Sequence, residues 1–520
     1  MKTSNYKLNN FTVYSLILLT NFVWYFFGLG KVANNLLNLD QKIMLLTASR
    51  MNYLKLDAFE AAWNHHTSPI NYIFKLSYFF ADFLNIEYGF YIIYSFLLLL
   101  INYVLYEICY KFTKNTMFSF LLSVCFIFDL STATVADYIL FDNRTIGILF
   151  QCLILYYGIK IITKETKNDI LFFSLFIFLQ IAFLESYIVS CGLLFIYLFF
   201  KVRNKIQYCK IFFASNILLS ILFFTVLYIN SELLETIYLN YQFHLDAIGI
   251  NSIQKIQLSN LFNYGLFKSW GLNKVSYLLT FGFIVMFYLK KEVFIANELI
   301  KNYFDFLTFY FIAEFLHVLL TGPRFVNYLQ LIILLKYLII FISVFFILKT
   351  FEISDKQTCI LISTLLITFF LFLQFDYFKN NRTSLFDSSY ESASEIKNPV
   401  SPVSKYLFKD GAPESILAWV SPNSWDDIYF YSNKLPATRM WWWFEMKYLE
   451  DVYNWKDGRY YNSDLEIIFM EDLFNEQPKL AIVEKGYILP PDFFIDYLEE
   501  NYIFINELEQ FYIYQLKSKS

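Results

Sequence analysis

Long apolar segments separated by short polar turns fill most of the first three quarters of the chain. Eleven of these segments approach the roughly 20 mostly apolar residues that a membrane-spanning helix needs. The expected spans are residues 11–30, 88–108, 116–133, 144–163, 168–183, 185–200, 210–229, 275–289, 302–320, 325–348 and 357–375. The pattern predicts a polytopic α-helical membrane protein with about 11 transmembrane helices.

Composition supports the same class. Of the 520 residues, 57% are hydrophobic and 17% are charged, and the mean hydropathy is +0.44. A water-soluble enzyme of ordinary composition is less apolar than this. We therefore expect membrane lipid as a partner and no nucleic acid.

The basic residues predict an orientation, because short loops rich in Lys and Arg stay in the cytoplasm. With a cytoplasmic N-terminus, the inner loops contain Lys111, Lys114, Lys160, Lys164, Lys167, Lys201, Arg203, Lys205, Lys210, Lys290, Lys291, Lys301, Lys349 and Lys356. The short outer turns at 131–143 and 181–184 contain no basic residue. An odd number of spans then places the C-terminal region outside, across what we take to be a bacterial inner membrane.

Three outer regions interrupt this pattern: a first outer loop at 31–87, a second at 230–274 and a C-terminal region at 376–520. The C-terminal region begins with a polar linker and then alternates short apolar runs with amphipathic ones, which indicates a small α/β domain. It contains 24 Asp and Glu against 14 Lys and Arg. The predicted domains are therefore a transmembrane domain at 1–375 and an extracytoplasmic α/β domain at 376–520.

The first outer loop concentrates polar chemistry in an otherwise apolar chain. Its stretch LDAFEAAWNHHTSPINY contains Asp57, Glu60, His65 and His66, and Asp40 precedes it by one amphipathic stretch. We expect that stretch to lie along the membrane interface. Asp40 would then lie near the outer surface, where a carboxylate can take the proton of an attacking hydroxyl. The alternative is that Asp40 only caps the following helix.

The order of these residues resembles the first outer loop of the GT-C superfamily, whose polytopic glycosyltransferases use polyprenyl-phosphate-linked sugars. The resemblance is to bacterial relatives of the protein O-mannosyltransferases. The matching residues are Asp40, Ala48, Asp57, His66 and Pro69. A Gly and an aromatic residue of the family pattern are missing.

Two further segments resemble the same family. The segment LLTGPRFVNYL resembles the family's R-x-F-x-H-Y pattern in Arg324, Phe325 and Tyr328, with Asn327 in place of the His. The segment 436–439, Pro-Ala-Thr-Arg, matches an element near the start of the exported domain in those relatives. The three matches occur in the expected order along nearly the whole chain.

The resemblance implies a transferase with a GT-C-like fold and a sugar donor on polyprenyl phosphate. The acceptor would be a glycan, a lipid or a protein. Asp40 would be the general base with Asp57 as a second catalytic carboxylate, and Arg324 would hold the lipid phosphate, assisted by Arg144. The remaining candidates for substrate binding are Glu60, His65, His66 and Tyr328.

Other interpretations of the same residues stay open. Arg324 would also suit ordinary snorkelling to the interface. No cofactor is firmly implied, but imidazole and carboxylate groups also suit a divalent cation, so metal dependence is undecided. The alternative functions are a transporter or flippase of lipid-linked sugars and an enzyme like the O-antigen polymerases and ligases. The chain lacks the duplicated halves common in transporters.

Overall fold

The computed structural model describes most of the helices and part of the C-terminal region. The described residues are 10–33, 39–61, 68–83, 86–131, 143–184, 187–229, 273–289, 297–321, 330–350, 357, 364, 401–439, 462–487, 490 and 492–518. The chain divides into two compact units. The helical unit comprises Met1–Gly28, Tyr94–Val226 and Asn251–Phe386, and the mixed unit comprises Leu29–Ile93, Leu227–Ile250 and Asp387–Ser520.

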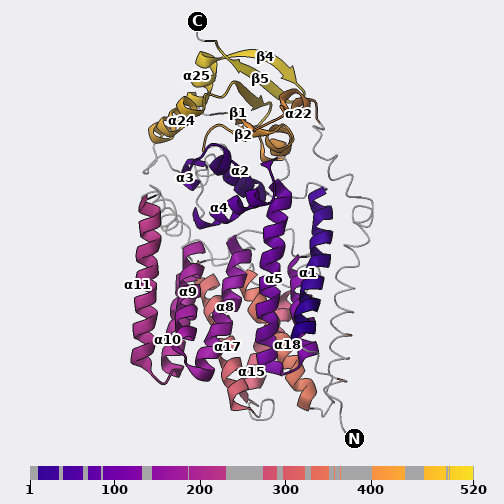
Figure 1. The fold of residues 1–520 in the computed structure, drawn as a ribbon, viewed down its shortest axis with the longest axis vertical. Coiled ribbons are helices and arrows are strands. Elements are labelled where there is room, and N and C mark those ends of the chain that lie inside the picture. Colours follow the sequence, from indigo (N-terminus) through magenta and orange to yellow (C-terminus); the bar gives the residue numbers. More distant parts are fainter. Residues whose placement is uncertain are drawn as a thin grey trace. The chain divides into compact units, whose positions relative to one another are not determined.

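Apolar helices occupy ten of the eleven predicted spans (Figure 1). They are α1 Asn10–Ala33, α5 Ile86–Thr113, α6 Thr116–Ser131, α8 Asn143–Lys164, α9 Lys167–Phe183, α10 Ile188–Lys201, α11 Lys205–Ile229, α15 Asn273–Leu289, α17 Glu298–Thr321 and α18 Gln330–Thr350. Nearly all of the eleventh, 357–375, lies outside the described residues, as does the boundary at 375/376. The chain is thus mostly helical, as predicted.

Four of the described stretches are long and apolar enough to cross a membrane: Tyr88–Thr113, Thr145–Lys164, Lys205–Ile229 and Ile332–Thr350. The other apolar helices include shorter ones such as Ile188–Lys201 and Tyr277–Leu289. These helices are compatible with a membrane protein, while the total of about eleven spans stays a prediction.

The helical unit packs around α8, α17 and α18, which contact one another. Close approach of α8 and α17 depends on Gly158, because a Cβ atom there would lie 2.2 Å from the ring of Phe306. Tyr337 of α18 donates a hydrogen bond of 3.1 Å to the Leu122 carbonyl of α6. The middle of the bundle is therefore closely packed, and one glycine sets one of its helix contacts.

Several turns that are rich in Lys and Arg meet at one end of the helical unit. The ammonium groups of Lys111 and Lys160 both lie over the ring of Tyr156, 5.1 and 4.9 Å from its centroid. The carboxylate of Glu165, after α8, accepts a hydrogen bond of 2.8 Å from the backbone N–H of Arg203, after α10. The ends of α5, α8 and α10 are therefore neighbours.

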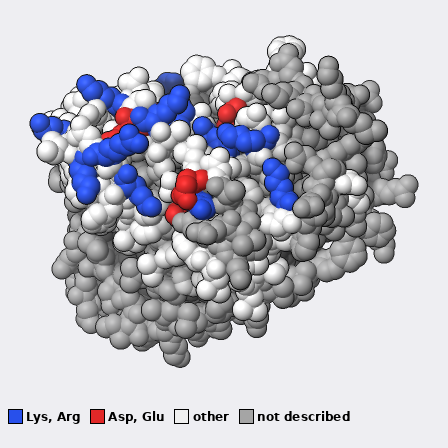
Figure 2. Space-filling view, turned by 90° about the horizontal axis from the view of Figure 1, so that it is seen from below, with Lys and Arg blue, Asp and Glu red and all other residues white. Residues whose placement is uncertain are grey.

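The start of α17 lies at this same end. The hydroxyl groups of Thr163 and Tyr303 are 2.7 Å apart and join the last turn of α8 to the first turns of α17. Figure 2 shows many Lys and Arg side chains gathered on the face seen from below. A basic end of this kind is what the orientation rule associates with the cytoplasm. The orientation itself stays a prediction.

Four helical segments in the mixed unit come from the first outer loop. They are α2 Leu39–Tyr53, α3 Ala58–Ala61, α4 Ser68–Lys75 and the 3₁₀ turn η1 Leu76–Phe79. Every residue from 43 to 51 is buried. Helix α2 is thus enclosed by protein on all sides there, instead of lying with one face on the membrane interface as expected. The surrounding elements are α3, α4 and strand β2 of the C-terminal region.

The C-terminal region of the mixed unit contains a five-stranded sheet in the order β2-β1-β3-β5-β4. Its strands are β1 Glu414–Trp419, β2 Lys434–Pro436, β3 Leu480–Glu484, β4 Tyr502–Leu508 and β5 Phe511–Leu516. β1 pairs in parallel with β2 and β3, whereas β5 pairs antiparallel with β3 and β4. The accompanying helices are α22 Pro402–Leu407, α24 Asn462–Glu476 and α25 Asp492–Asn501. The predicted small sheet is confirmed.

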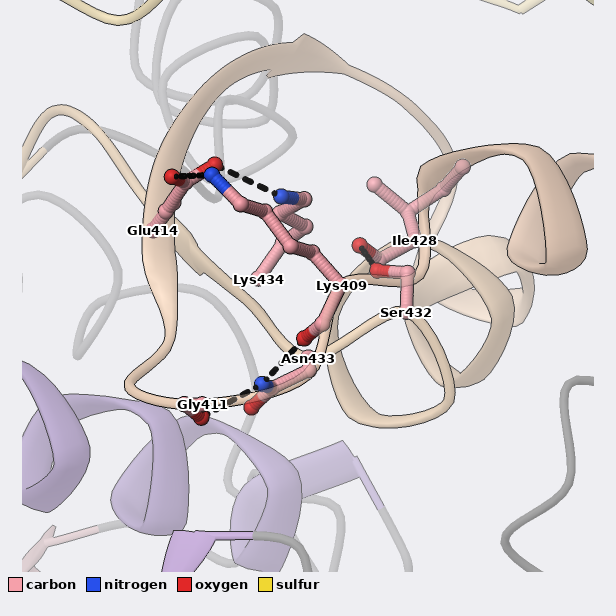
Figure 3. A network of polar contacts seen from close by, with 7 residues as sticks. All are labelled: Lys409, Gly411, Glu414, Ile428, Ser432, Asn433 and Lys434. Atoms are coloured by element: carbon pink, nitrogen blue, oxygen red, sulfur yellow. Dashed lines mark hydrogen bonds and ion pairs between the residues drawn. The ribbon is translucent and has the colours of Figure 1, made fainter.

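A polar network stabilises the parallel edge of this sheet (Figure 3). The Glu414 carboxylate accepts from Lys409 at 2.5 Å and from the buried Lys434 at 3.1 Å. The side-chain amide of Asn433 donates to the carbonyl groups of Lys409 and Gly411, at 2.8 and 2.9 Å. Asn433 has a φ of 56°, in the left-handed region that Asn tolerates better than most residues. The network thus fixes the entries to β1 and β2.

Candidate functional site

The structure describes only part of the predicted site. Asp40 lies in the first turn of α2 and Glu60 in α3, but only their backbones are described. Arg144 lies in the first turn of α8, and again only its backbone is described. The predicted residues His65, His66, Arg324 and Tyr328 lie outside the described residues. The structure therefore neither brings these side chains together nor separates them.

Asp57 is the one predicted site residue with a described side chain. It is partly exposed and directly precedes α3, and its carbonyl accepts a hydrogen bond of 3.0 Å from the backbone N–H of Ala61. Between α2 and Asp57 the chain turns at Lys55, whose φ is 61°. The Lys55 ammonium donates to the Asn52 carbonyl at 2.7 Å and so satisfies an acceptor near the end of α2. The turn places Asp57 at the start of a helix, where a carboxylate is favoured.

The N-terminal part of α2 is attached to the C-terminal region by an ion pair. The Lys42 ammonium lies 2.7 Å from the Asp426 carboxylate, and the two side chains are 12% and 27% exposed. Asp426 begins the short helical segment η8 Asp426–Phe430. Because Lys42 follows Asp40 by two residues, the helix turn that contains the predicted base is fixed to the C-terminal region.

Arg50 makes the main buried connection between α2 and its surroundings. Its side chain is fully buried, and it donates from Nη1 to the Ala61 carbonyl at 2.6 Å and from Nη2 to the Ala437 carbonyl at 3.3 Å. Burial lowers the pKa of Arg50 to about 10, although the charges of Asp472 and Glu476 oppose that shift. The guanidinium therefore keeps its charge at neutral pH.

The segment around Ala437 is itself held within the C-terminal region. The Arg439 guanidinium donates to Asp472 of α24, from Nε at 3.0 Å and from Nη2 at 2.9 Å. The backbone N–H of Arg439 also donates to that carboxylate, at 2.6 Å. Two-point contact of this kind fixes both groups in orientation. The segment Pro-Ala-Thr-Arg at 436–439 thus connects α24 on one side with Arg50 on the other.

Aromatic side chains complete the contact between the first outer loop and the C-terminal region. The ring of Phe83 stacks on Phe430 of η8, with centroids 6.2 Å apart and planes 7° apart. The Tyr53 hydroxyl accepts a hydrogen bond of 3.2 Å from the backbone N–H of Phe83. Tyr78 of η1 donates to Ser49 of α2 at 2.5 Å. Both ends of the described loop are thereby anchored.

Within the described residues, no group of three or more His, Cys, Asp or Glu side chains is arranged to hold a metal ion. The imidazole and carboxylate groups that suggest a divalent cation in the sequence lie among the side chains that are not described. The described residues therefore do not test metal dependence.

No family model matches the chain, and no curated protein matches it. The resemblance to GT-C glycosyltransferases therefore rests on the three short sequence matches and stays a prediction.

Sequence reasoning missed Arg50, and it missed Glu314 and His317 in α17. Arg50 lies in a stretch that reads as amphipathic, and nothing local indicates that its guanidinium is enclosed. Glu314 and His317 did carry a signal, because both interrupt the apolar sequence FIAEFLHVLL within a predicted span. Ionisable residues inside such spans are expensive and usually functional.

Proposed function

We propose that this protein is a membrane-bound glycosyltransferase that moves a sugar from a polyprenyl-phosphate donor to an acceptor on the extracytoplasmic side. The hydrogen bond from Arg50 to Ala437 is the observation that carries the proposal. It joins two segments 387 residues apart, and each contains one of the family-like matches. If the two segments resembled the family only by chance, we would not expect them to pack against each other.

The proposed step is a direct displacement at the anomeric carbon of the donor sugar. The Asp40 carboxylate takes the proton of the acceptor hydroxyl, whose oxygen forms a bond to the anomeric carbon. The bond from that carbon to the phosphate oxygen breaks, and its electron pair leaves with the polyprenyl phosphate. The configuration at the sugar carbon is inverted.

Fixed positive charge would stabilise the departing phosphate in this step. The proposed groups are Arg324 and Arg144, because a planar guanidinium can donate two hydrogen bonds to one phosphate. Arg144 lies in the first turn of α8, and Arg324 follows the end of α17 by three residues. The start of α8 and the end of α17 are the ends of these helices opposite the basic turns.

The test is sugar transfer by membranes containing Asp40→Asn, with radiolabelled sugar on polyprenyl phosphate as the donor. Loss of a general base predicts a decrease of at least about 100-fold. Asp82→Asn is the matched control, because Asp82 lies exposed in the same loop. Unchanged transfer by a correctly inserted Asp40→Asn variant would remove Asp40 as the base.

A carrier of lipid-linked sugars is the second candidate function. The observation that favours it is the pair of ionisable side chains in α17, Glu314 and His317, which are 1% and 0% exposed. Transport proteins use buried acids and imidazoles for proton relays. A carrier would leave the bond between sugar and phosphate intact, so the products of the reaction distinguish the two functions.

A further inference from the structure

Helix α17 carries two buried ionisable residues on one side. Glu314 and His317 are three residues apart, so their side chains are neighbours on the helix surface. The ring of His317 stacks on Tyr187 at the start of α10, with centroids 4.4 Å apart. The contact between His317 and Tyr187 lies about one helical turn closer to the C-terminal end of α17 than Glu314 does.

These residues lie at the end of the helical unit opposite the basic turns. Glu314 is 16 residues beyond Glu298, or about 24 Å along the helix axis at 1.5 Å per residue. Tyr187 precedes α10, whose other end is basic. The cluster is therefore remote from the Lys and Arg side chains of Figure 2.

Polar but uncharged groups surround the Glu314 carboxyl. Gln151 of α8 and Ser190 of α10 are its polar neighbours, and both are fully buried. The Ser190 hydroxyl already donates to the Tyr187 carbonyl at 3.1 Å. Among the described residues, neither the nitrogen nor the oxygen of the Gln151 side chain has a hydrogen-bond partner of good geometry, and neither does Oε2 of Glu314. Leaving such groups unsatisfied in a buried site is unfavourable.

The titratable groups facing Glu314 do not supply a positive charge. They are Tyr310 on α17 itself and Cys191 on α10. The buried charged group of the neighbouring α18 is Lys336, whose ammonium lies 4.1 Å from the centroid of the Tyr277 ring of α15. In the described part of the chain, no Lys or Arg forms an ion pair with Glu314.

An ionised carboxylate buried without a counter-charge is very costly, and such a group binds a proton instead. We propose that Glu314 is a proton-binding site within the helical unit, with His317 as the group that exchanges its proton. A protonated carboxyl donates one hydrogen bond and accepts another, which matches the amide of Gln151. The O–H would donate to the amide oxygen, and the amide N–H would donate to the remaining carboxyl oxygen.

This site is independent of the proposed transferase chemistry, because the outer-loop carboxylates take no part in it. Release of the proton would place a negative charge among neutral groups, so the neighbouring helices would have to rearrange or admit a cation or water. The described residues offer no group of metal ligands at this site, so the ligand that we propose for it is a proton. Such a group would serve proton-coupled movement of substrate.

The test is infrared difference spectroscopy of the full-length protein in lipid nanodiscs at neutral pH. Subtracting the Glu314→Gln spectrum from the wild-type spectrum should leave the carbonyl band of a protonated carboxylic acid, and that band should shift in D₂O. Glu298→Gln is the matched control. Glu298 lies on the same helix, its side chain is 80% exposed and it pairs with Lys301 at 2.8 Å, so it should yield a carboxylate band.

Two results would overturn the proposal. A carboxylate band in place of the acid band for Glu314 would show that the group is ionised and neutralised by a cation. An unchanged rate of hydrogen–deuterium exchange of the acid band in His317→Ala would remove His317 as the exchanging group, whereas we expect a decrease of at least tenfold.

Discussion

Arg50 and Ala437 join the first outer loop to the C-terminal region through a hydrogen bond of 3.3 Å between the Arg50 Nη2 and the Ala437 carbonyl. The same guanidinium donates to Ala61 at 2.6 Å, so one buried side chain connects α2, α3 and the end of β2. The C-terminal region and the first outer loop are therefore parts of one compact unit, although the apolar helices separate them in the sequence. The proposed catalytic base lies in a helix whose position depends on both.

Replacing Arg50 should loosen this unit. Arg50→Lys keeps the charge but cannot donate to both carbonyl groups, so we expect a loss of about 2–3 kcal/mol in the free energy of unfolding. Hydrogen exchange should accelerate both in 43–51 and in 434–438. Arg439→Lys is the control, because the Arg439 guanidinium donates to Asp472 within its own region. Exchange that changes in only one of the two segments for Arg50→Lys would argue against a shared unit.

The ion pair between Lys42 and Asp426 should behave as a charge-dependent contact. Both Lys42→Glu and Asp426→Lys should lower the thermal stability of the protein in detergent, since each places like charges side by side. The two changes together should recover most of the loss, with a coupling of about 1 kcal/mol for such a partly buried pair. Additive effects of the two changes would contradict a direct contact.

Acid should weaken the network around Glu414. The hydrogen bond from Lys409 holds the pKa of Glu414 below its usual range, and Lys434 adds to this shift. Because the pKa is lower in the folded state, the carboxylate stabilises the protein above the unfolded pKa, about 4.3, and the contribution disappears as the pH falls through the folded pKa.

This contribution should be below about 1 kcal/mol, because the Glu414 side chain is 39% exposed and solvent screens it. The measurement is the unfolding temperature of wild type and Glu414→Gln as a function of pH. Their difference should be present at neutral pH and shrink in acid. A difference that stays constant over this range would show that ionisation of Glu414 does not stabilise the sheet edge.

The contact between α8 and α17 gives a steric prediction. Gly158→Ala would place a methyl group 2.2 Å from the Phe306 ring and should cost about 1–3 kcal/mol of stability. Adding Phe306→Leu should recover part of this loss by making room. Gly192→Ala in α10 meets no atom within 4 Å and should be neutral or slightly stabilising. Equal effects of the two glycine changes would contradict the close approach of these helices.

The helices could be predicted from sequence because each apolar span is a local pattern. The boundaries expected for 144–163 and 168–183 differ from the observed α8 and α9 by a single residue at most. The enclosure of α2 could not be predicted, because it arises in part from strand β2, about 390 residues later in the chain. The apolar run 426–432 resembles its strand-forming neighbours in composition, yet Asp426–Phe430 forms a helical turn at the contact with Lys42 and Phe83.

The candidate site was less predictable than the fold. The motif matches place Asp40 and the segment 436–439 in separate regions of the chain, and no local pattern states that these regions pack together. Arg50 reads as one basic residue in an amphipathic helix, and its burial depends on tertiary contacts to Ala61 and Ala437. The environment of a side chain at the site therefore depends on tertiary contacts more than on the spacing of residues in the sequence.

The most direct test of the proposed function asks whether the bond between sugar and phosphate is cleaved. Purified protein in liposomes would receive polyprenyl phosphate carrying a radiolabelled sugar, together with glycan, lipid and protein acceptors from a bacterial envelope. A glycosyltransferase should release free polyprenyl phosphate as the labelled sugar appears on an acceptor, and Asp40→Asn should abolish both. Labelled sugar that crosses the bilayer while still attached to polyprenyl phosphate, in wild type and Asp40→Asn alike, would contradict the account and identify a carrier.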